Sequence, residues 1–147
     1  MVGTFEGRYS GLHVMKFIGL DGNSYAVQLI HQNNLTKEVS APHERMRKLL
    51  KELFRLDRVW EEFPLPGTNP KLYFDFFIVS RRLAFEVHGK QHTEHVRYFH
   101  PRKSDFVKAK SNDIAKREWC KLNNITLIEV FDKETIDEWR KRILDNS

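Results

Sequence analysis

Two strand-like segments of the sequence carry ionisable residues in positions where apolar residues are the rule. The stretch from residue 74 to residue 92, FDFFIVSRRLAFEVHGKQH, holds Asp75, Glu86, His88 and His92 among aromatic and branched residues. Burying an unpaired charge costs several kcal/mol, so each of these residues needs a specific reason to be there. Carboxylates bind hard divalent cations such as Mg²⁺, and imidazoles transfer protons near neutral pH. Together these groups could perform metal-assisted hydrolysis.

An antiparallel hairpin would bring these residues together. If residues 81–82 form the turn, Asp75 lies opposite His88, and Phe77 lies opposite Glu86. Because side chains alternate between the two faces of a strand, Asp75, Glu86 and His88 should project from one face. Opposed residues have Cβ atoms about 4.5–5.5 Å apart, and diagonal ones about 7–8 Å. A divalent cation could therefore bridge Asp75 and Glu86, with His88 beside it.

The alternative is a half-solvated hairpin whose polar face is simply hydrated. Two features favour a site. The polar residues gather at the Asp75 end of the strands, while Val79 and Ala84 on the same face are apolar. Gly89 permits a sharp turn that returns His92 toward the cluster.

The remaining segments predict the elements that position this hairpin. Strand-like segments at 13–19 and 25–30 flank a turn, and a helix covers about 41–55 after a capping Ser40. After the hairpin we expect a helix of about 104–122 and a buried strand at 125–131. The chain ends with a helix that has Ile136, Trp139, Ile143 and Leu144 on one face. This order predicts an α/β fold, with a mixed central β-sheet flanked by helices and an extra N-terminal β-hairpin. We expect one compact unit, with the hairpin extension at 1–35 and the core at 36–147.

The composition limits the class of protein. The chain has 147 residues, 40% of them hydrophobic, and a formal net charge of +5, which is typical of a globular domain with an anionic partner such as nucleic acid. A single cysteine, Cys120, excludes an internal disulfide and indicates a reducing, intracellular setting. The sequence shows neither a long apolar run nor a signal peptide, so we expect neither a membrane span nor secretion.

Positive charge is concentrated after the hairpin. Residues 97–121 contain eight Lys or Arg and three acidic residues. Such a segment can track phosphates while its aromatic residues stack on bases, although a charged helix face that is merely solvated is the alternative. The candidate nucleic-acid-binding residues are Arg97, Tyr98, Phe99, Arg102, Lys103, Lys108, Lys110 and Arg117.

A zinc site is a further alternative, because four histidines fall between residues 88 and 100. Their spacing matches no compact zinc motif, and no cysteine partners are present. Cys120 lies on an apolar helix face, where a core position is more common than a nucleophile.

The segment from about residue 40 to residue 132 resembles a known family of nucleases. Its most specific parts are the Asp75 strand, the ExxGxQH block at 86–92 and the DxxKxxxC pattern at 113–120. These parts resemble nucleases related to very-short-patch repair endonuclease, a branch of the PD-(D/E)XK superfamily that includes phage-type homing endonucleases. The resemblance implies a restriction-endonuclease-like sheet, with Asp75 as the central metal ligand and Glu86 as the second acidic residue.

The resemblance also implies roles for residues outside the two strands. His92 matches the family's proton-transfer histidine, Asp113 and Lys116 match its helix pair, and Glu44 matches an acidic residue of the first helix. Helical projection places Glu44 opposite the apolar positions, so a solvated first-turn residue is the alternative. His88 stands where the superfamily has its lysine, and we expect it to orient the site while His92 transfers the proton.

These observations predict a Mg²⁺-dependent DNA endonuclease, with Mn²⁺ as a substitute cation. Homing, mismatch-directed nicking and junction resolution remain open, and the resemblance extends to proteins encoded by phages in bacterial hosts. A catalytically inactive DNA-binding module and a zinc-stabilised interaction domain are the alternatives. The sequence does not decide whether the chain forms a homodimer or what the N-terminal hairpin does.

Overall fold

The computed structural model describes residues 5–9, 12–29, 38–89 and 103–147, with side chains for residues 14–29, 38–89 and 107–147. In chain order the elements are β1 (Phe5–Tyr9), β2 (Leu12–Ile18), β3 (Ser24–Leu29), α1 (Ala41–Leu53), β4 (Trp60–Leu65), β5 (Leu72–Ile78), a 3₁₀ turn (Val79–Arg81), β6 (Leu83–His88), α3 (Lys103–Leu122), β7 (Thr126–Phe131) and α4 (Ile136–Asn146).

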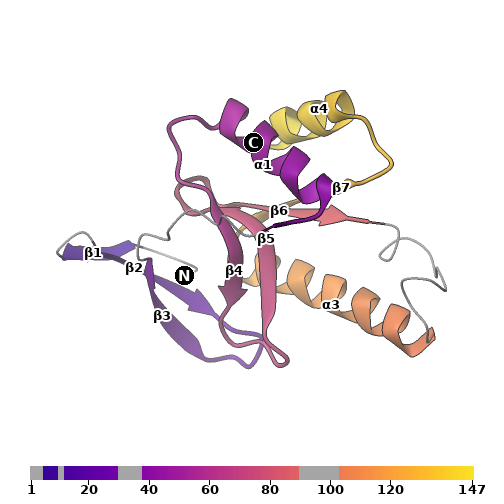
Figure 1. The fold of residues 1–147 in the computed structure, drawn as a ribbon. Helices are drawn as coiled ribbons and strands as arrows, with labels where there is room; N and C mark the ends of the chain where they lie inside the picture. The colour runs from indigo at the N-terminus through magenta and orange to yellow at the C-terminus, as the bar shows by residue number, and fades with distance from the viewer. Residues whose placement is uncertain (1–4, 10–11, 30–37, 90–102) are drawn as a thin grey trace.

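The central sheet has four strands in the order β4-β5-β6-β7. The first three strands are antiparallel, whereas β6 and β7 are parallel and joined through α3. Helices α1 and α4 cover one face of this sheet, and α3 lies on the other, where the N-terminal sheet β1-β2-β3 also packs (Figure 1). The predicted fold class, a mixed α/β sheet flanked by helices with an N-terminal hairpin, is confirmed.

Local sequence signals explain where the outer helices begin. The Ser40 hydroxyl caps α1 by accepting a hydrogen bond from the His43 amide at 3.4 Å, and a capping box at Thr135 and Glu138 starts α4. Trp139 is buried against the sheet face. Leu144, which we expected on that face, is 55% exposed because it lies beyond the stripe that packs on the sheet.

The N-terminal sheet shares its core with the central sheet. The hairpin β2-β3 follows the prediction, and β1, which was not predicted, pairs with β2. The Asn123 side chain at the end of α3 accepts a hydrogen bond from the Ile18 amide at 2.7 Å and donates one to the Ile18 carbonyl at 2.8 Å. Gly19 lies against Gly67, where a Cβ atom on Gly19 would come within 2.5 Å of the Gly67 Cα. The division at residue 35 stays a prediction.

Strand β4 was not predicted, because its end overlaps the segment FPLPGTNPK, which carries three prolines and a glycine. Proline cannot donate to a strand ladder, yet Pro64 is accommodated because β4 is at the edge of the four-stranded sheet.

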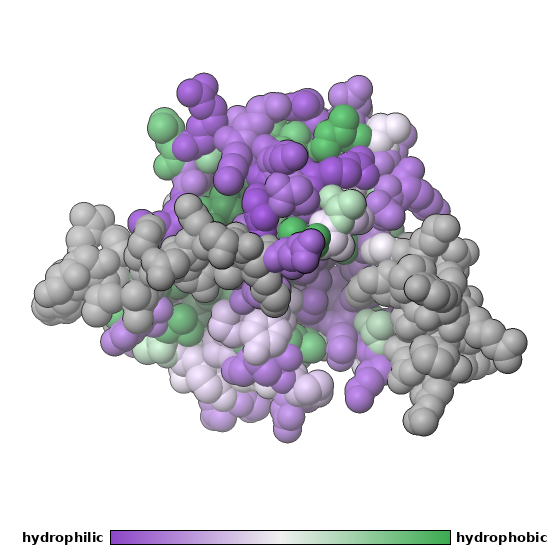
Figure 2. Space-filling view, in the orientation of Figure 1, coloured by the Kyte–Doolittle hydropathy of each residue, from purple (hydrophilic) through white to green (hydrophobic). Residues whose placement is uncertain are grey.

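Within the described residues, no helix is both long enough and apolar enough to cross a membrane. The face drawn in Figure 2 is largely hydrophilic where its residues are described, with apolar residues in small separate patches.

Candidate functional site

The hairpin β5-β6 has a different register from the one we expected. The observed pairs are Phe76–Phe85, Phe77–Ala84 and Ile78–Leu83. The expected pairing of Phe77 with Glu86 is therefore wrong by two residues, because the connection is longer and includes the 3₁₀ turn and Arg82 in a left-handed conformation (φ 53°). A shift of two residues preserves the alternation of faces, so Asp75 and Glu86 still project toward α3.

Asp75 and Glu86 hold the two strands together where the backbone pairing ends. The Asp75 amide donates a hydrogen bond to Glu86 Oε2 at 2.7 Å, and the Val87 amide donates one to Asp75 Oδ2 at 2.9 Å. Each carboxylate thus binds the backbone of the neighbouring strand. This exchange of hydrogen bonds restrains both side chains.

Lys116 brings a positive charge to the same place. Its Nζ lies 2.6 Å from Glu86 Oε1 and reaches that atom from α3. The family resemblance assigns Lys116 to the helix pair of the site, and its position beside Glu86 agrees with that assignment. A lysine from the helix therefore stands next to the carboxylate pair, whereas position 88 holds a histidine.

Glu86 is an unusual carboxylate. Its side chain is 3% exposed, and burial together with the neighbouring Asp75 charge raises its pKa to about 8, against the opposing effect of Lys116. His88 is also 3% exposed. A hydrated polar face, the alternative considered for this hairpin, does not describe these two residues.

His88 faces a different pair of carboxylates from the one expected. Its Nε2 lies 2.7 Å from Glu129 Oε1 on β7, and its Nδ1 lies 4.0 Å from Asp113 Oδ2 on α3. The expectation that His88 sits across from Asp75 is wrong, because the register places Glu86 there instead. His88 also stacks on Phe131, with ring centroids 5.2 Å apart.

Glu129 was missed by the sequence reasoning. Burial alone would raise its pKa, but hydrogen bonds from His88 and Arg117 outweigh burial and lower the pKa to about 2. The signal was present in the sequence, since Glu129 interrupts the apolar strand ITLIEVF in the same way that Asp75 and Glu86 interrupt theirs. Arg117, expected to contact nucleic acid, donates two hydrogen bonds to Glu129.

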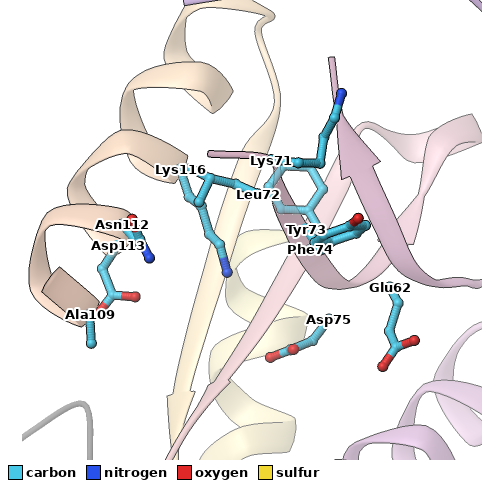
Figure 3. Close-up of a pocket in the computed structure, with 10 residues that line it drawn as sticks. All are labelled: Glu62, Lys71, Leu72, Tyr73, Phe74, Asp75, Ala109, Asn112, Asp113 and Lys116. Atoms are coloured by element: carbon cyan, nitrogen blue, oxygen red, sulfur yellow. The ribbon is translucent and has the colours of Figure 1, made fainter. Parts of the chain in front are cut away.

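A pocket of about 590 Å³ opens between the start of β5 and α3. Figure 3 shows Lys116 and Asp113 extending from α3 on one side of Asp75, with Glu62 on the other side. The lining residues are Glu62, Lys71, Leu72, Tyr73, Phe74, Asp75, Ala109, Asn112, Asp113 and Lys116. The structure therefore gathers Asp75, Asp113 and Lys116 at one opening, with Glu86 buried behind it.

Glu62 is a second residue that the sequence reasoning missed. The pairs Glu61–Phe76 and Phe63–Phe74 bracket it, which places Glu62 opposite Asp75 in the β4-β5 register. Its φ of 51° is left-handed, a conformation that costs a non-glycine residue roughly 1–2 kcal/mol. No sequence signal marks Glu62, which follows another glutamate in a stretch where no helix or strand was predicted.

Glu44 does not line this pocket. It forms an ion pair with Arg47 at 2.7 Å, and Arg47 in turn binds Glu61 of β4. Its neighbour His43 stacks on Phe76, which packs in the core beneath α1 on the opposite face of the sheet.

Several predicted residues lie outside the described part of the chain. These are His92, Arg97, Tyr98, Phe99 and Arg102, together with the side chain of Lys103. The return of the chain after Gly89 is likewise outside it. Lys108 is exposed and Lys110 partly exposed on α3, but neither lines the pocket.

Of the four histidines behind the zinc alternative, the described part of the chain includes His88, while His92, His95 and His100 lie outside it. In that part of the chain, no three His, Cys, Asp or Glu side chains are close enough together to hold a metal ion by themselves. Cys120 is buried, and burial raises its pKa to about 12, so its expected place in the core is confirmed and a reactive thiolate is excluded.

Two viral proteins are similar to parts of this chain. The uncharacterized protein 307L of Invertebrate iridescent virus 6 is 37% identical over 62 residues, which is 42% of this chain and 32% of that protein. The uncharacterized protein 094L of Frog virus 3 (isolate Goorha) is 33% identical over 81 residues, which is 54% of this chain and 52% of that protein. The chain therefore spans about half or less of the relatives it matches.

No family model matches the chain, and no solved structure matches it significantly. The two relatives are iridovirus proteins rather than phage proteins, so the phage association that came with the resemblance has no support among them.

Proposed function

We propose that the chain is a Mg²⁺-dependent DNA endonuclease that hydrolyses phosphodiester bonds. The observation that carries the proposal is the group formed by Asp75, Glu86 and Lys116, in which two carboxylates from adjacent strands meet a lysine at the wall of an open pocket. A carboxylate with a raised pKa beside a charged partner in a cleft is typical of a functional site.

The chemistry of the donor set fits Mg²⁺. Carboxylate oxygens are the hard ligands that this cation prefers, and proteins commonly bind it through one or two carboxylates while water and substrate phosphate complete the shell. Asp75 and Glu86 supply such a pair. The absence of a three-residue metal group among the described side chains argues against a closed protein cage, not against this kind of site.

The charge of the pocket supports a cation requirement. Three carboxylates and two lysine ammonium groups line it, and Glu86 lies behind them. This excess of negative charge repels a phosphodiester. A divalent cation held by Asp75 and Glu86 would offset this negative charge, and it would supply polarisation of the phosphate and acidification of the attacking water.

The residues of this chain have separable tasks in the proposed reaction. Lys116 opposes the rise in the pKa of Glu86 and offers an ammonium group to the developing negative charge on the phosphate. Glu129 orients His88, and His88 in turn faces Asp113 at the pocket wall. His92 remains the proposed proton donor for the leaving oxygen, on the strength of the family resemblance.

Incubation with DNA tests the proposal directly. Supercoiled plasmid, a mismatched duplex and a four-way junction should be incubated with Mg²⁺, with Mn²⁺ and with EDTA. We expect cleavage of at least one substrate in either cation and none in EDTA. Binding without cleavage in both cations would favour the inactive DNA-binding module, and absence of both would refute the proposal.

The setting proposed for this activity is intracellular. The lone buried Cys120 is compatible with a reducing compartment. Homing, mismatch and junction roles, and a homodimer, remain alternatives within the same proposal.

A further inference from the structure

We infer that the pocket beside Asp75 is a nucleotide subsite, in which Tyr73 stacks on an unpaired base next to the phosphate that is cut. The inference rests on the proposed nuclease function and narrows its substrate class to DNA with an unpaired or extruded nucleotide at the cleavage position. It uses residues that had no role in the sequence reasoning: Tyr73, Asn112 and Lys71.

Tyr73 has the position that such a contact requires. It is 48% exposed, whereas its neighbours Leu72 and Phe74 are buried in the core. Tyr73 and Asp75 are two residues apart on β5, so they lie on the same side of the strand about 6.6 Å apart along it. A base on the tyrosine ring would therefore belong to a nucleotide at or next to the phosphate that Asp75 would hold through a bound cation.

The rest of the pocket suits a nucleotide. Its volume of about 590 Å³ lies within the range of about 300–1,000 Å³ common for small-ligand sites. Asn112 lies one helical turn before Lys116 on α3 and presents an amide that can both donate to and accept from a base edge. Lys71 stands at the exposed start of β5, where its ammonium group can bind an adjacent phosphate.

A continuous duplex cannot use this subsite. Within a duplex both faces of each base are covered by their neighbours, and enzymes that contact a base face act on single strands or on bases turned out of the stack. A tyrosine ring set into a pocket therefore favours mismatches, junctions, flaps or bulges over an intact recognition sequence.

Binding of two matched probes tests the inference. One probe is a continuous duplex, and the other is the same duplex with a single unpaired 2-aminopurine. Affinity and 2-aminopurine fluorescence are measured with the full chain in Ca²⁺, with a gel to verify that the DNA stays intact. The variants are Tyr73→Ala and Tyr73→Phe, with Leu144→Ala as control because Leu144 is similarly exposed (55%) but lies on α4.

The wild type should bind the unpaired probe more tightly than the duplex and quench its fluorescence. Tyr73→Ala should weaken binding of the unpaired probe by about 5- to 150-fold, the scale of one lost base–aromatic stack, and should lose the quenching. Tyr73→Phe should retain both properties because it keeps the ring face, and Leu144→Ala should behave as the wild type.

The opposite outcomes overturn the inference. Retention of both the preference and the quenching by Tyr73→Ala would refute it. Equal losses in Tyr73→Phe and Tyr73→Ala would also refute it, because they would assign the effect to the hydroxyl group. A wild type that cuts DNA but binds both probes equally would refute the subsite and leave the nuclease standing. A wild type that neither binds nor cuts any DNA would refute both.

Discussion

Two groups of charged residues lie on opposite faces of the central sheet, and they differ in how their carboxylates are compensated. Beneath α1, Glu61 receives two hydrogen bonds of 2.8 Å from Arg47 and lies 2.9 Å from His43. Beneath α3, the buried Glu86 receives a single ammonium group, from Lys116, and stands beside another carboxylate, Asp75.

The pKa values move in opposite directions as a result. Burial would raise the pKa of Glu61, but Arg47 and His43 outweigh it and lower the pKa below its usual value. Burial and Asp75 raise the pKa of Glu86 to about 8. A fully compensated group stabilises the fold, whereas an under-compensated group at a pocket is prepared to accept a further cation. The α1 group is therefore structural, and the α3 group is the candidate site.

The strongest test of this contrast is Asp75→Asn. We expect cleavage to fall by about 10³-fold or more, because loss of a metal ligand removes several kcal/mol of stabilisation of the transition state. The fold should be little affected, since the asparagine oxygen can still accept the Val87 amide. Plasmid cleavage, DNA binding and thermal unfolding should be measured on the same preparation.

Glu61→Gln is the matched control on the other face. It removes one carboxylate charge from the α1 group and should leave the cleavage rate of the folded protein unchanged. Equal loss of cleavage in both variants would contradict the assignment of separate roles to the two groups.

Lys116→Met should have the next largest effect. It removes the cation that opposes the raised pKa of Glu86 and the ammonium group proposed to face the phosphate, so we expect the single-turnover rate to fall by about 10²-fold. DNA affinity should fall much less. If affinity and rate fell by the same factor, Lys116 would be a phosphate contact of the kind first expected for the basic helix.

The pH dependence of the unfolding free energy should have opposite signs for Glu86 of the α3 group and Glu61 of the α1 group. Between about pH 4.5 and about pH 8 the folded state keeps a proton on Glu86 that the unfolded state has lost, so the unfolding free energy falls as pH rises through this range. Glu86→Gln should remove this decline, so the stability of the variant relative to the wild type should increase as pH rises. Denaturant unfolding at several pH values measures it.

Glu61→Gln should behave in the opposite way. The lowered pKa of Glu61 means that its contribution is present above about pH 4.5 and is lost in acid. We expect a loss of about 1–3 kcal/mol near neutral pH, from its two charge-assisted hydrogen bonds. If the unfolding free energy of Glu86→Gln changed with pH in parallel with that of the wild type, the raised pKa of Glu86 would be contradicted.

The fold could be predicted largely from periodicity and punctuation. The helix cap at Ser40 and the turn at residues 21–23 are local signals, which can be recognised in a single sequence. Strand β4 could not be predicted, because its proline, Pro64, is tolerated only at a sheet edge, and edge position depends on the tertiary fold. The β5-β6 register failed for a related reason, since it depends on the length of a 3₁₀ turn.

The part of the site that depends only on the alternation of side chains along a strand could be predicted from the sequence. Asp75 and Glu86 share a face under either register, so their association survived an error of two residues. The predicted partner of His88 was wrong, because the carboxylate nearest to His88 depends on the β5-β6 register and on the position of β7. Glu62 and Tyr73 could be recognised as pocket residues only from the positions of β4 and β5 beside α3.

Glu62→Gln offers the smallest and most delicate test of the contrast between the two groups. Glu62 adds a carboxylate to a pocket that already repels phosphate, and it is exposed to solvent. Exposed charges interact by about 0.2–1 kcal/mol, so we expect DNA affinity in EDTA to rise by about 1.5- to 5-fold at low salt and the gain to shrink as salt increases. Asp137→Asn, in the exposed first turn of α4, removes the same charge away from the pocket and should change affinity less. Equal gains in DNA affinity in the two variants would mean that only the net charge of the protein matters. That result would contradict binding of DNA at the pocket.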